Sequence, residues 1–343
     1  MKRTSLIFKK PFEIELRQEP LRSPREGEVL IKTQLSAISR GTEMLVYGGQ
    51  FPSELPVDEN IAALNHQFCY PLKYGYSSIG QVVEIGPAVE KAWLDRTVFC
   101  FHPHESHYIE RQDYLIPVPA DIHPMDAVFL PNMETAVNFM MDGRPTIGES
   151  VVVFGQGVVG LLTTALLAQY PLGALVTLDQ STIRRKKSQD VGAHCTLDPD
   201  VSDLQDELTS MLEVGCGEKR ADLIYEISGN PRALNQALNI AGFAARIVIG
   251  SWYGTKKTEL ELGGRFHRDR IRLISSQVST LAPVFSGRWD KARRLKVSWD
   301  MIRRQKPAHF VTQRIGFQRV KEAYELLDKR PHETIQVILT YED

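Results

Sequence analysis

Three glycines with the spacing G-x-G-x-x-G, Gly155, Gly157 and Gly160, follow the apolar run VVVF and precede a stretch with helical periodicity. In a strand–turn–helix unit the first glycine permits the tight turn, the second lets a diphosphate approach the backbone, and the third lets the helix pack closely on the strand. The start of the helix, at Val158 and Val159, adds N–H groups without helical partners and a partial positive charge. We therefore expect this turn to bind the diphosphate of a dinucleotide. A glycine-rich turn in an ordinary α/β sheet is the alternative.

An acidic residue, Asp179, ends the next apolar run, ALVTLD, 19 positions after Gly160. Its carboxylate would accept hydrogen bonds from the hydroxyls of an adenosine ribose and repel a 2′-phosphate, which favours NAD over NADP. The basic run Arg184–Lys187 keeps NADP open, because cations just past this strand can bind a 2′-phosphate. Arg184 is thus a candidate cofactor ligand, although charges that continue around a helix are also typical of a solvated face.

A second glycine-spaced segment, GYSSIGQVVEIG (75–86), has the frame of a well-known zinc-binding segment but carries Tyr76-Ser77 where that segment has His-Glu. Either a metal site has lost its ligands or the spacing of the glycines is accidental. The run HPHESH (102–107) also invites a metal hypothesis, since alternate residues of a strand share a face. No further ligand cluster is evident there, so a substrate-side polar wall or a surface loop explains its histidines better.

The elements that must position these residues change along the chain. The first 120 residues contain short alternating runs, such as EVLIKTQLSAIS (28–39) and RTVFCF (96–101), separated by Pro and Gly, and we expect them to be β-rich. From about residue 150, apolar runs alternate with helical patterns, which predicts a parallel sheet covered on both faces. After about residue 280 the patterns mix, and we expect this part to pack back onto the first domain. The predicted fold class is α/β.

Composition limits the partners. The 343 residues suggest two domains, and their net charge of −1 gives no long-range attraction to nucleic acid or an anionic membrane. Cys69, Cys100, Cys195 and Cys216 fit neither a zinc-lobe nor a disulfide spacing, which suits a reducing cytoplasm. The most apolar run, 151–168, is near the minimum length of a membrane span, but it contains three glycines and a Gln. We expect it to belong to a nucleotide-binding domain.

Taken in order, these segments resemble the medium-chain dehydrogenase/reductase superfamily, the fold of zinc alcohol dehydrogenases, over nearly the whole chain. The resemblance rests on GYSSIGQVVEIG, on SRGTE (39–43), on LDQSTIRRKKSQDVGA (178–193) and on the C-terminal segment 311–341. It implies a GroES-like β-rich catalytic domain made of residues 1–135 and 280–343, and a Rossmann doubly wound parallel-sheet domain made of residues 136–279. It also implies an active site in the interdomain cleft and a homodimer.

The departures from the family pattern concern zinc. The family holds catalytic zinc by Cys, His and Cys, sometimes with Glu; the corresponding positions here are Arg40 or Ser39, Tyr76 and Pro131, with Ser77 in place of the Glu. These residues do not make a tetrahedral zinc site, and the four clustered cysteines of the family's structural zinc are missing, so we expect no zinc. SAISRGTEMLVYGG and HRDRIRLISSQVS most resemble a zinc-lacking branch that includes the bacteriochlorophyllide hydroxyethyl dehydrogenases.

Without zinc, the proton of a substrate hydroxyl must be handled by a base or a hydrogen-bond relay. By resemblance, Thr42 contacts the substrate hydroxyl. Tyr76 lies where the zinc His would point into the cleft; its phenol could act on an alcohol or carbonyl, with a pKa lowered by a cation such as Lys73 or Arg40, or it could fill the vacated metal cavity. Glu43 matches an acid of the family that could orient Arg40 or form a structural salt bridge.

The resemblance implies further contacts with the cofactor. Thr135 would lie under the nicotinamide. The adenosine side and the carboxamide end would meet residues that follow later strands, namely Ser228, Gly229, Gly250, Ser251, Ser276 and Val278.

These features predict a zinc-independent NAD(P)-dependent oxidoreductase that transfers a hydride between the nicotinamide and a secondary alcohol or ketone. An NADPH-dependent quinone or enone reductase and a non-enzymatic nucleotide-binding protein are the alternatives. The segment 47–72 is expected to shape the pocket, and its aromatic and apolar content suggests a bulky or partly apolar small-molecule substrate. His66, within this segment, is a candidate proton shuttle.

Overall fold

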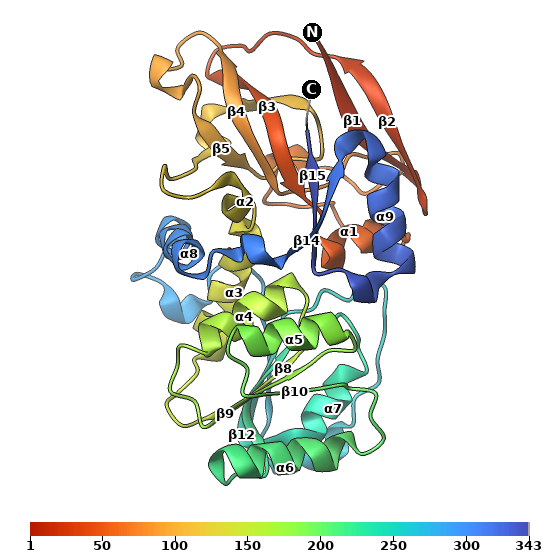
Figure 1. Cartoon of the computed structure of the whole chain (residues 1–343), viewed down its shortest axis with the longest axis vertical. Coiled ribbons are helices and arrows are strands. Elements are labelled where there is room, and N and C mark those ends of the chain that lie inside the picture. The colour runs from red at the N-terminus through yellow and green to blue at the C-terminus, as the bar shows by residue number, and fades with distance from the viewer. Residues whose placement is uncertain (342–343) are drawn as a thin grey trace. The chain divides into compact units, whose positions relative to one another are not determined.

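The computed structural model describes residues 1–341, apart from the side chains of Ala62 and Cys216, and it divides into two compact units (Figure 1). Unit 1 consists of residues 1–131 and the segment from residue 302 onward, and unit 2 consists of residues 132–301. Each unit is built around its own sheet, so the two are described separately.

Unit 2 contains a six-stranded parallel sheet in the order β10-β9-β8-β11-β12-β13. Its strands are β8 (Ser150–Phe154), β9 (Ala174–Leu178), β10 (Cys195–Leu197), β11 (Ala221–Glu226), β12 (Ala241–Ile249) and β13 (Arg272–Ser275). Helices α4 (Val158–Leu167) and α5 (Thr182–Asp190) lie on one face, and α6 (Leu204–Cys216) and α7 (Ala233–Ile240) on the other (Figure 1). This is the doubly wound order, which reverses between β8 and β11. The predicted Rossmann-type sheet is confirmed.

Alternate residues of the central strand enter two separate apolar cores. Val151 and Val153 of β8 pack with Phe139 and with neighbouring strands on one face. Val152 and Phe154 pack on the other face with apolar residues of α6 and α7. Because both faces are covered, the strand must be apolar at every position, and this explains the unbroken run VVVF in the sequence.

Unit 1 contains a seven-stranded sheet in the order β14-β15-β3-β4-β5-β7, with β6 paired to β3, and a separate hairpin of β1 (Lys2–Lys10) and β2 (Glu13–Pro20). The strands of the sheet are β3 (Glu28–Ala37), β4 (Ser78–Ile85), β5 (Thr97–Cys100), β6 (His107–Arg111), β7 (Ile116–Pro117), β14 (Val311–Gly316) and β15 (Gln336–Thr340). Strand β15 pairs antiparallel with β3, so the end of the chain completes the β-rich unit that the first residues begin. The predicted β-rich domain is thus confirmed.

Helices α1 (Arg40–Tyr47), α2 (Pro124–Ala127) and α9 (Val320–Lys329) also belong to unit 1, and α1 and α9 enclose its main apolar core. The segment 47–72 contributes Phe51, Val57 and Leu64 to this core, and the ring of Phe51 stacks on Phe68 with 4.3 Å between the ring centroids. Much of the apolar content that suggested an apolar ligand is therefore used in packing the unit itself.

Both unit boundaries differ from the sequence expectation, because residues 132–135 and 280–301, which it assigned to the β-rich domain, group with unit 2. The reason is Arg294 of helix α8 (Lys291–Gln305), whose side chain is fully buried. Its guanidinium donates to Glu134 at 2.9 Å and to Asn138 at 2.7 Å. Both partners lie on α3 (Leu130–Gly143), so this buried ionic cluster holds α8 to α3.

No helix among residues 1–341 combines the length and the apolarity that a membrane span requires. The apolar run 151–168 instead supplies β8, the glycine turn and α4. Cys69, Cys100 and Cys195 are free thiols, and the side chain of Cys216 lies outside the described part of the chain.

We predict that Arg294→Met destabilises the protein by about 3–5 kcal/mol, because it leaves the buried carboxylate of Glu134 unpaired. Arg265→Met is the matched control, since Arg265 is exposed and pairs with Asp269 one helical turn away, and it should cost less than about 1 kcal/mol. Urea unfolding of both variants measures the difference. Equal midpoints for the two would show that Arg294 does not stabilise unit 2.

Candidate functional site

The turn Gly155–Gly160 joins β8 to α4 where the strand order reverses. Gly155 has a φ of +95°, and a Cβ there would lie 2.6 Å from the Cα of Ser228. A Cβ on Gly160 would lie 2.0 Å from the carbonyl oxygen of Gly155, whereas a Cβ on Gly157 would meet nothing within 4 Å. The fold itself therefore requires the first and third glycines. The second leaves open space before the helix N-terminus, which fits the approach of a diphosphate.

Asp179 follows β9, and its carboxylate accepts hydrogen bonds from the backbone N–H groups of Gln156 and Ser181, both at 2.8 Å. The first of these bonds attaches the acid to the glycine turn. Arg184 does not lie on a solvated face, as the charge pattern allowed; it is 4% exposed, and its guanidinium is 3.8 Å from the Asp179 carboxylate. The structure thus brings Asp179 and Arg184 together beside the turn.

Glu226, at the end of β11, is a fully buried acid that our sequence analysis did not single out. Its carboxylate accepts from the N–H of Ser228 at 2.9 Å, from the hydroxyl of the same residue, and from the hydroxyl of Tyr253. The hydroxyl of Ser251 accepts from the N–H of Gly229 at 2.9 Å. These bonds join the loops after β11 and β12 at the edge of the sheet where the glycine turn lies. In the sequence, the only sign of this role is that Glu226 is an acidic residue at the end of an apolar strand.

Helix α3 carries Thr135 at a partly exposed position between two buried residues. One helical turn further on, the ring of Phe139 lies 2.1 Å from where a Cβ on Gly250 would be. Glycine at position 250 therefore lets α3 approach the end of β12. Close packing gives Gly250 a structural reason to be present, in addition to the contact with the cofactor that the resemblance implies.

The segment expected at the carboxamide end is held by polar contacts within unit 2. The hydroxyl of Ser276 donates to Asp142 at 2.6 Å and accepts from Asn138 at 3.0 Å. The carbonyl of Val278 accepts from the guanidinium of Arg294. Asn138 and Asp142 belong to α3, so α3 and α8 together fix the backbone from Ser276 to Val278. The sequence does not reveal that Arg294 is buried, because a charged residue breaks the apolar pattern of a core helix.

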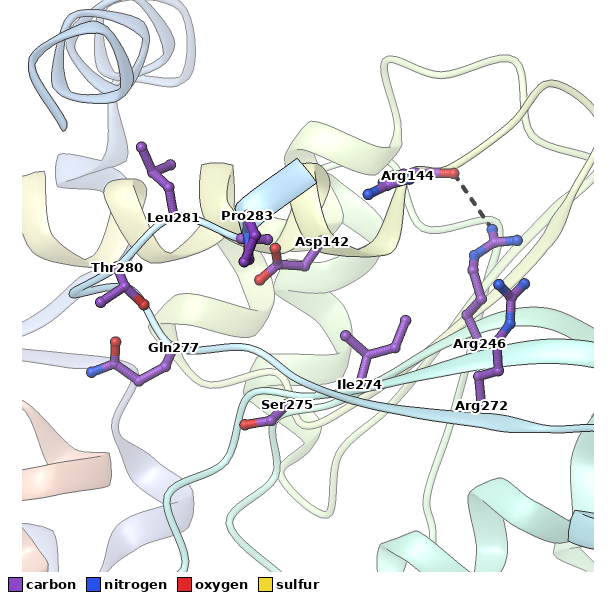
Figure 2. Close-up of a pocket in the computed structure, with 11 residues that line it drawn as sticks. Asp142, Arg144, Arg246, Arg272, Ile274, Ser275, Gln277, Thr280, Leu281 and Pro283 are labelled. Atoms are coloured by element: carbon purple, nitrogen blue, oxygen red, sulfur yellow. Dashed lines mark hydrogen bonds between the residues drawn. The ribbon is translucent and has the colours of Figure 1, made fainter. Parts of the chain in front are cut away.

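A cavity of about 410 Å³ lies beside this segment (Figure 2). Figure 2 shows Arg246 and Arg272 next to each other at one end of the cavity and Asp142 near its centre. Arg246 already binds Glu149 at 2.6 Å and the carbonyl of Gly143 at 2.9 Å. Burial raises the pKa of Asp142, and its hydrogen bonds only partly offset this. Arg246 is therefore held in place by partners within unit 2.

Three hydroxyl groups meet at the start of α1 in unit 1. The phenol of Tyr76 donates to the hydroxyl of Ser39, and it lies 3.4 Å from the hydroxyl of Thr42. Burial raises the pKa of Tyr76, and its bonds to Ser39 and Thr42 only partly offset this. The expectation of a pKa lowered by a cation such as Lys73 is wrong, because that ammonium binds Glu105 at 2.6 Å instead. Tyr76 is therefore a neutral hydrogen-bond donor at physiological pH.

Glu43 is fully buried and accepts three hydrogen bonds from different parts of unit 1. The donors are the N–H of Ser39 at 2.7 Å, Nε2 of His104 at 3.0 Å and the hydroxyl of Tyr324 at 2.5 Å. With Nε2 as the donor, Nδ1 of His104 accepts from the hydroxyl of Ser36 at 2.7 Å. The surface-loop interpretation is thus wrong for His104, which is fully buried. Glu43 fixes the start of α1 and with it the position of Ser39.

The glycine frame of residues 75–86 is explained in part by packing against this buried histidine. Gly75 has a φ of +122°, and a Cβ there would lie 2.7 Å from the ring of His104. Ser77, in place of the family's Glu, donates to the backbone carbonyl of residue 128 at 2.6 Å. Ser39 and Tyr76 present hydroxyls where the family has a thiolate and an imidazole, so these two positions do not fit the donor set that binds catalytic zinc.

His66 pairs through Nδ1 with the backbone carbonyl of Gln67 at 3.1 Å. Its side chain is exposed, and it lines a cavity of about 650 Å³ together with Lys73, His102 and Glu105. Thr42 and Tyr76 are not among the described residues that line this cavity. The structure therefore does not bring the candidate proton shuttle to the other three candidate catalytic residues.

Comparisons with known proteins agree with this architecture. Residues 158–296 match the family model described as zinc-binding dehydrogenase. The starvation-sensing protein RspB of Escherichia coli K12 is 22% identical, over 99% of each chain, and an L-threonine 3-dehydrogenase of Pyrococcus horikoshii is 26% identical, over 75% of this chain and 78% of its own. The crystal structure of an E. coli CFT073 alcohol dehydrogenase (rspB), complexed with NADH, matches with a TM-score of 0.79 at 20% identity, over 99% of each chain.

We predict that Gly157→Ala leaves the unfolding midpoint unchanged but weakens binding of NADH by at least about tenfold, or about 1.4 kcal/mol. The added methyl group meets no protein atom within 4 Å, yet it occupies the space through which a diphosphate would approach. Calorimetric titration with NADH measures the affinity.

Gly263→Ala is the matched control, because a Cβ there also meets nothing within 4 Å and Gly263 lies outside the turn. Unchanged NADH affinity in Gly157→Ala would exclude the turn Gly155–Gly160 as the diphosphate site.

Proposed function

Starting from the similarity to the zinc-binding dehydrogenase superfamily, we propose that this protein is an NAD(P)-dependent oxidoreductase acting on a secondary alcohol or the matching ketone. The observation that carries the proposal is the turn Gly155–Gly160 at the reversal of the strand order, with Asp179 attached to it. The relatives support the same class of reaction, since they include proteins named as dehydrogenases of threonine and of (R,R)-butanediol.

NAD is the proposed cofactor, and the bound nicotinamide would accept the hydride from the alcohol carbon or return it to a ketone. The turn would hold the diphosphate by backbone N–H groups at the start of α4, and Asp179 would accept from the adenosine ribose. An acid at this place opposes a 2′-phosphate, and Arg184 lies within 4 Å of the acid rather than on a solvated face. Ser276 and Val278, fixed by α3 and α8, would support the carboxamide end.

The hydroxyl cluster of Ser39, Thr42 and Tyr76 is proposed to handle the substrate proton. Tyr76 donates to Ser39, and Thr42 is within reach of the same phenol, so the three groups form a short relay of hydroxyls. With its pKa raised by burial, Tyr76 would donate a hydrogen bond to a substrate oxygen rather than act as an anionic base. Glu43 is a positioning residue, because it holds the N–H of Ser39.

We further propose that the reaction proceeds without zinc at the family's catalytic ligand positions, as the resemblance to the bacteriochlorophyllide hydroxyethyl dehydrogenases suggests. The support is the chemistry of the side chains, since Ser39 and Tyr76 offer hydroxyls and Ser77 is used to bind a backbone carbonyl. The family model that matches is described as zinc-binding, so this is the part of the proposal that departs from the relatives. A cytoplasmic homodimer, expected from the sequence, is part of the same proposal.

Turnover tests the proposed reaction. With NAD⁺, we expect secondary alcohols to give a rise in the absorbance of the reduced nicotinamide, and Gly157→Ala to lower the rate at subsaturating NAD⁺ in a protein of unchanged fold. Turnover of quinones or enones with NADPH but not of alcohols with NAD⁺ would favour the reductase alternative instead. Cofactor binding without turnover of any of these substrates would favour a non-enzymatic nucleotide-binding protein.

Tyr76→Phe should lower kcat/KM by about 100-fold or more, because it removes one positioned proton donor. Since the pKa of Tyr76 is raised above its usual value of 10, loss of its proton lies above that pH, and the shape of the pH–rate profile between pH 6 and 9 should be the same in the variant. Tyr74→Phe, which removes a neighbouring phenol hydroxyl, is the control. A limb in the wild-type profile below pH 9 that disappears in Tyr76→Phe would contradict this role.

A further inference from the structure

A cluster of metal-ligating side chains in unit 1 is not used by the proposed reaction. Ligand atoms of Cys100, His102 and Glu110 all lie within 4.8 Å of one another. Cys100 ends β5, His102 lies in the loop that follows, and Glu110 lies on β6, so two strands and a loop contribute. These positions differ from those of the family's catalytic zinc, which correspond here to Ser39 or Arg40, Tyr76 and Pro131.

Unpaired polar atoms surround the cluster. Nδ1 of His102 has no hydrogen-bond partner, although the side chain as a whole is only 8% exposed. The buried hydroxyls of Tyr108 and Ser78 also make no hydrogen bond of full geometry, although they lie close enough to interact with each other, and Tyr108 with Cys100. A buried polar group without a hydrogen bond costs about 1–3 kcal/mol, so Nδ1 of His102 needs a physical explanation.

The other ring nitrogen of His102 is held in the way that metal-binding histidines require. Nε2 lies 3.1 Å from a carboxylate oxygen of Glu105; when Nε2 donates its proton to this acid, the neutral ring has its lone pair on Nδ1. Glu105 is itself held by Lys73 at 2.6 Å and Arg3 at 3.1 Å. The imidazole stacks on the ring of Tyr108 with 3.8 Å between centroids, which fixes its orientation. Nδ1 lies 3.7 Å from a carboxylate oxygen of Glu110 and within 4.8 Å of the Cys100 sulfur.

We propose that Cys100 Sγ, His102 Nδ1 and the Glu110 carboxylate bind a zinc ion, with a water molecule as the fourth ligand. Zinc takes a thiolate, an imidazole and a carboxylate at about 2.3, 2.0–2.1 and 2.0–2.2 Å, respectively, which separates the ligand atoms of a tetrahedral site by about 3.3–3.6 Å. Nδ1 of His102 and the nearest oxygen of Glu110 are 3.7 Å apart, close to this separation, and all three ligand atoms lie within 4.8 Å of one another, so the longer separations must shorten when an ion binds.

Charge and access also suit an ion at this place. A thiolate and a carboxylate together balance the charge of Zn²⁺, whereas the negative charge of Glu105 is already balanced by Lys73 and Arg3. His102 and Glu110 both line the cavity of about 650 Å³, which provides an entry path and room for the fourth ligand. Cys100 closes the opposite side, within the apolar cluster that contains Tyr108.

Cobalt(II) titration of the purified, chelator-treated full-length protein tests the proposal. We expect one equivalent of Co²⁺ to give the intense visible bands of tetrahedral coordination and a thiolate-to-cobalt charge-transfer band, and one equivalent of Zn²⁺ to abolish both. Cys100→Ser should remove the charge-transfer band, and His102→Ala should weaken Co²⁺ binding by about 100-fold or more. The readout needs no cofactor and no turnover, so it is independent of the proposed function.

Cys195→Ser and His66→Ala are the matched controls, since the first removes a thiol from unit 2 and the second removes a histidine from the same cavity. Both should keep the wild-type spectrum. Circular dichroism confirms that each variant is folded, and Glu110→Gln, which changes a partly exposed residue, gives a second measurement if Cys100→Ser does not fold. Three results would each overturn the proposal. The first is a wild-type protein without the charge-transfer band, and the second is a band that persists in Cys100→Ser. The third is a Co²⁺ affinity that is unchanged in both His102→Ala and Glu110→Gln.

Discussion

The contact between the backbone of the first glycine of the turn and the start of α4 constrains the rest of unit 2. A side chain at Gly160 would overlap the carbonyl of Gly155, so the helix can begin directly over the turn only because no Cβ is present. This contact fixes the direction of the helix and the position of its free N–H groups. The neighbouring loop, joined through Glu226, can then approach the same edge of the sheet. The geometry of the turn is thus a consequence of close packing rather than of any charged side chain.

In each unit, one buried charged side chain joins several segments of the chain. In unit 2, Arg294 joins two helices and the segment that ends at Thr280 through one guanidinium. In unit 1, Glu43 joins α1, α9 and the loop of His104 through one carboxylate. Each group would be costly to bury alone, and each is tolerated because it is hydrogen-bonded to partners from more than one segment. The geometry of the neighbouring hydroxyls therefore depends on contacts that lie outside the site itself.

Two regions of unit 1 differ in the side chains that they could offer to a metal ion. At the start of α1, hydroxyls replace the ligands of the family, and the phenol of Tyr76 is paired with Ser39. Near the end of β5, a thiol, an imidazole nitrogen and a carboxylate lie close together, and Nδ1 of His102 makes no hydrogen bond. A similarity to zinc-binding dehydrogenases therefore does not by itself say where on this chain an ion binds. The chemistry of the individual side chains decides that question.

The sequence by itself determined the fold class and the glycine turn between β8 and α4, because both depend on local patterns: unbroken apolar strands, helical periodicity and glycine spacing. It also contains hydroxyl side chains, Ser39 and Tyr76, at the positions where the resemblance implies zinc ligands. Only the tertiary structure decided how Arg184, His104 and Arg294 are used, since their burial depends on partners up to 160 residues away. The raised pKa of Tyr76 and the grouping of Cys100 with Glu110 were decided in the same way, as both follow from burial and from strands that meet only in the folded unit.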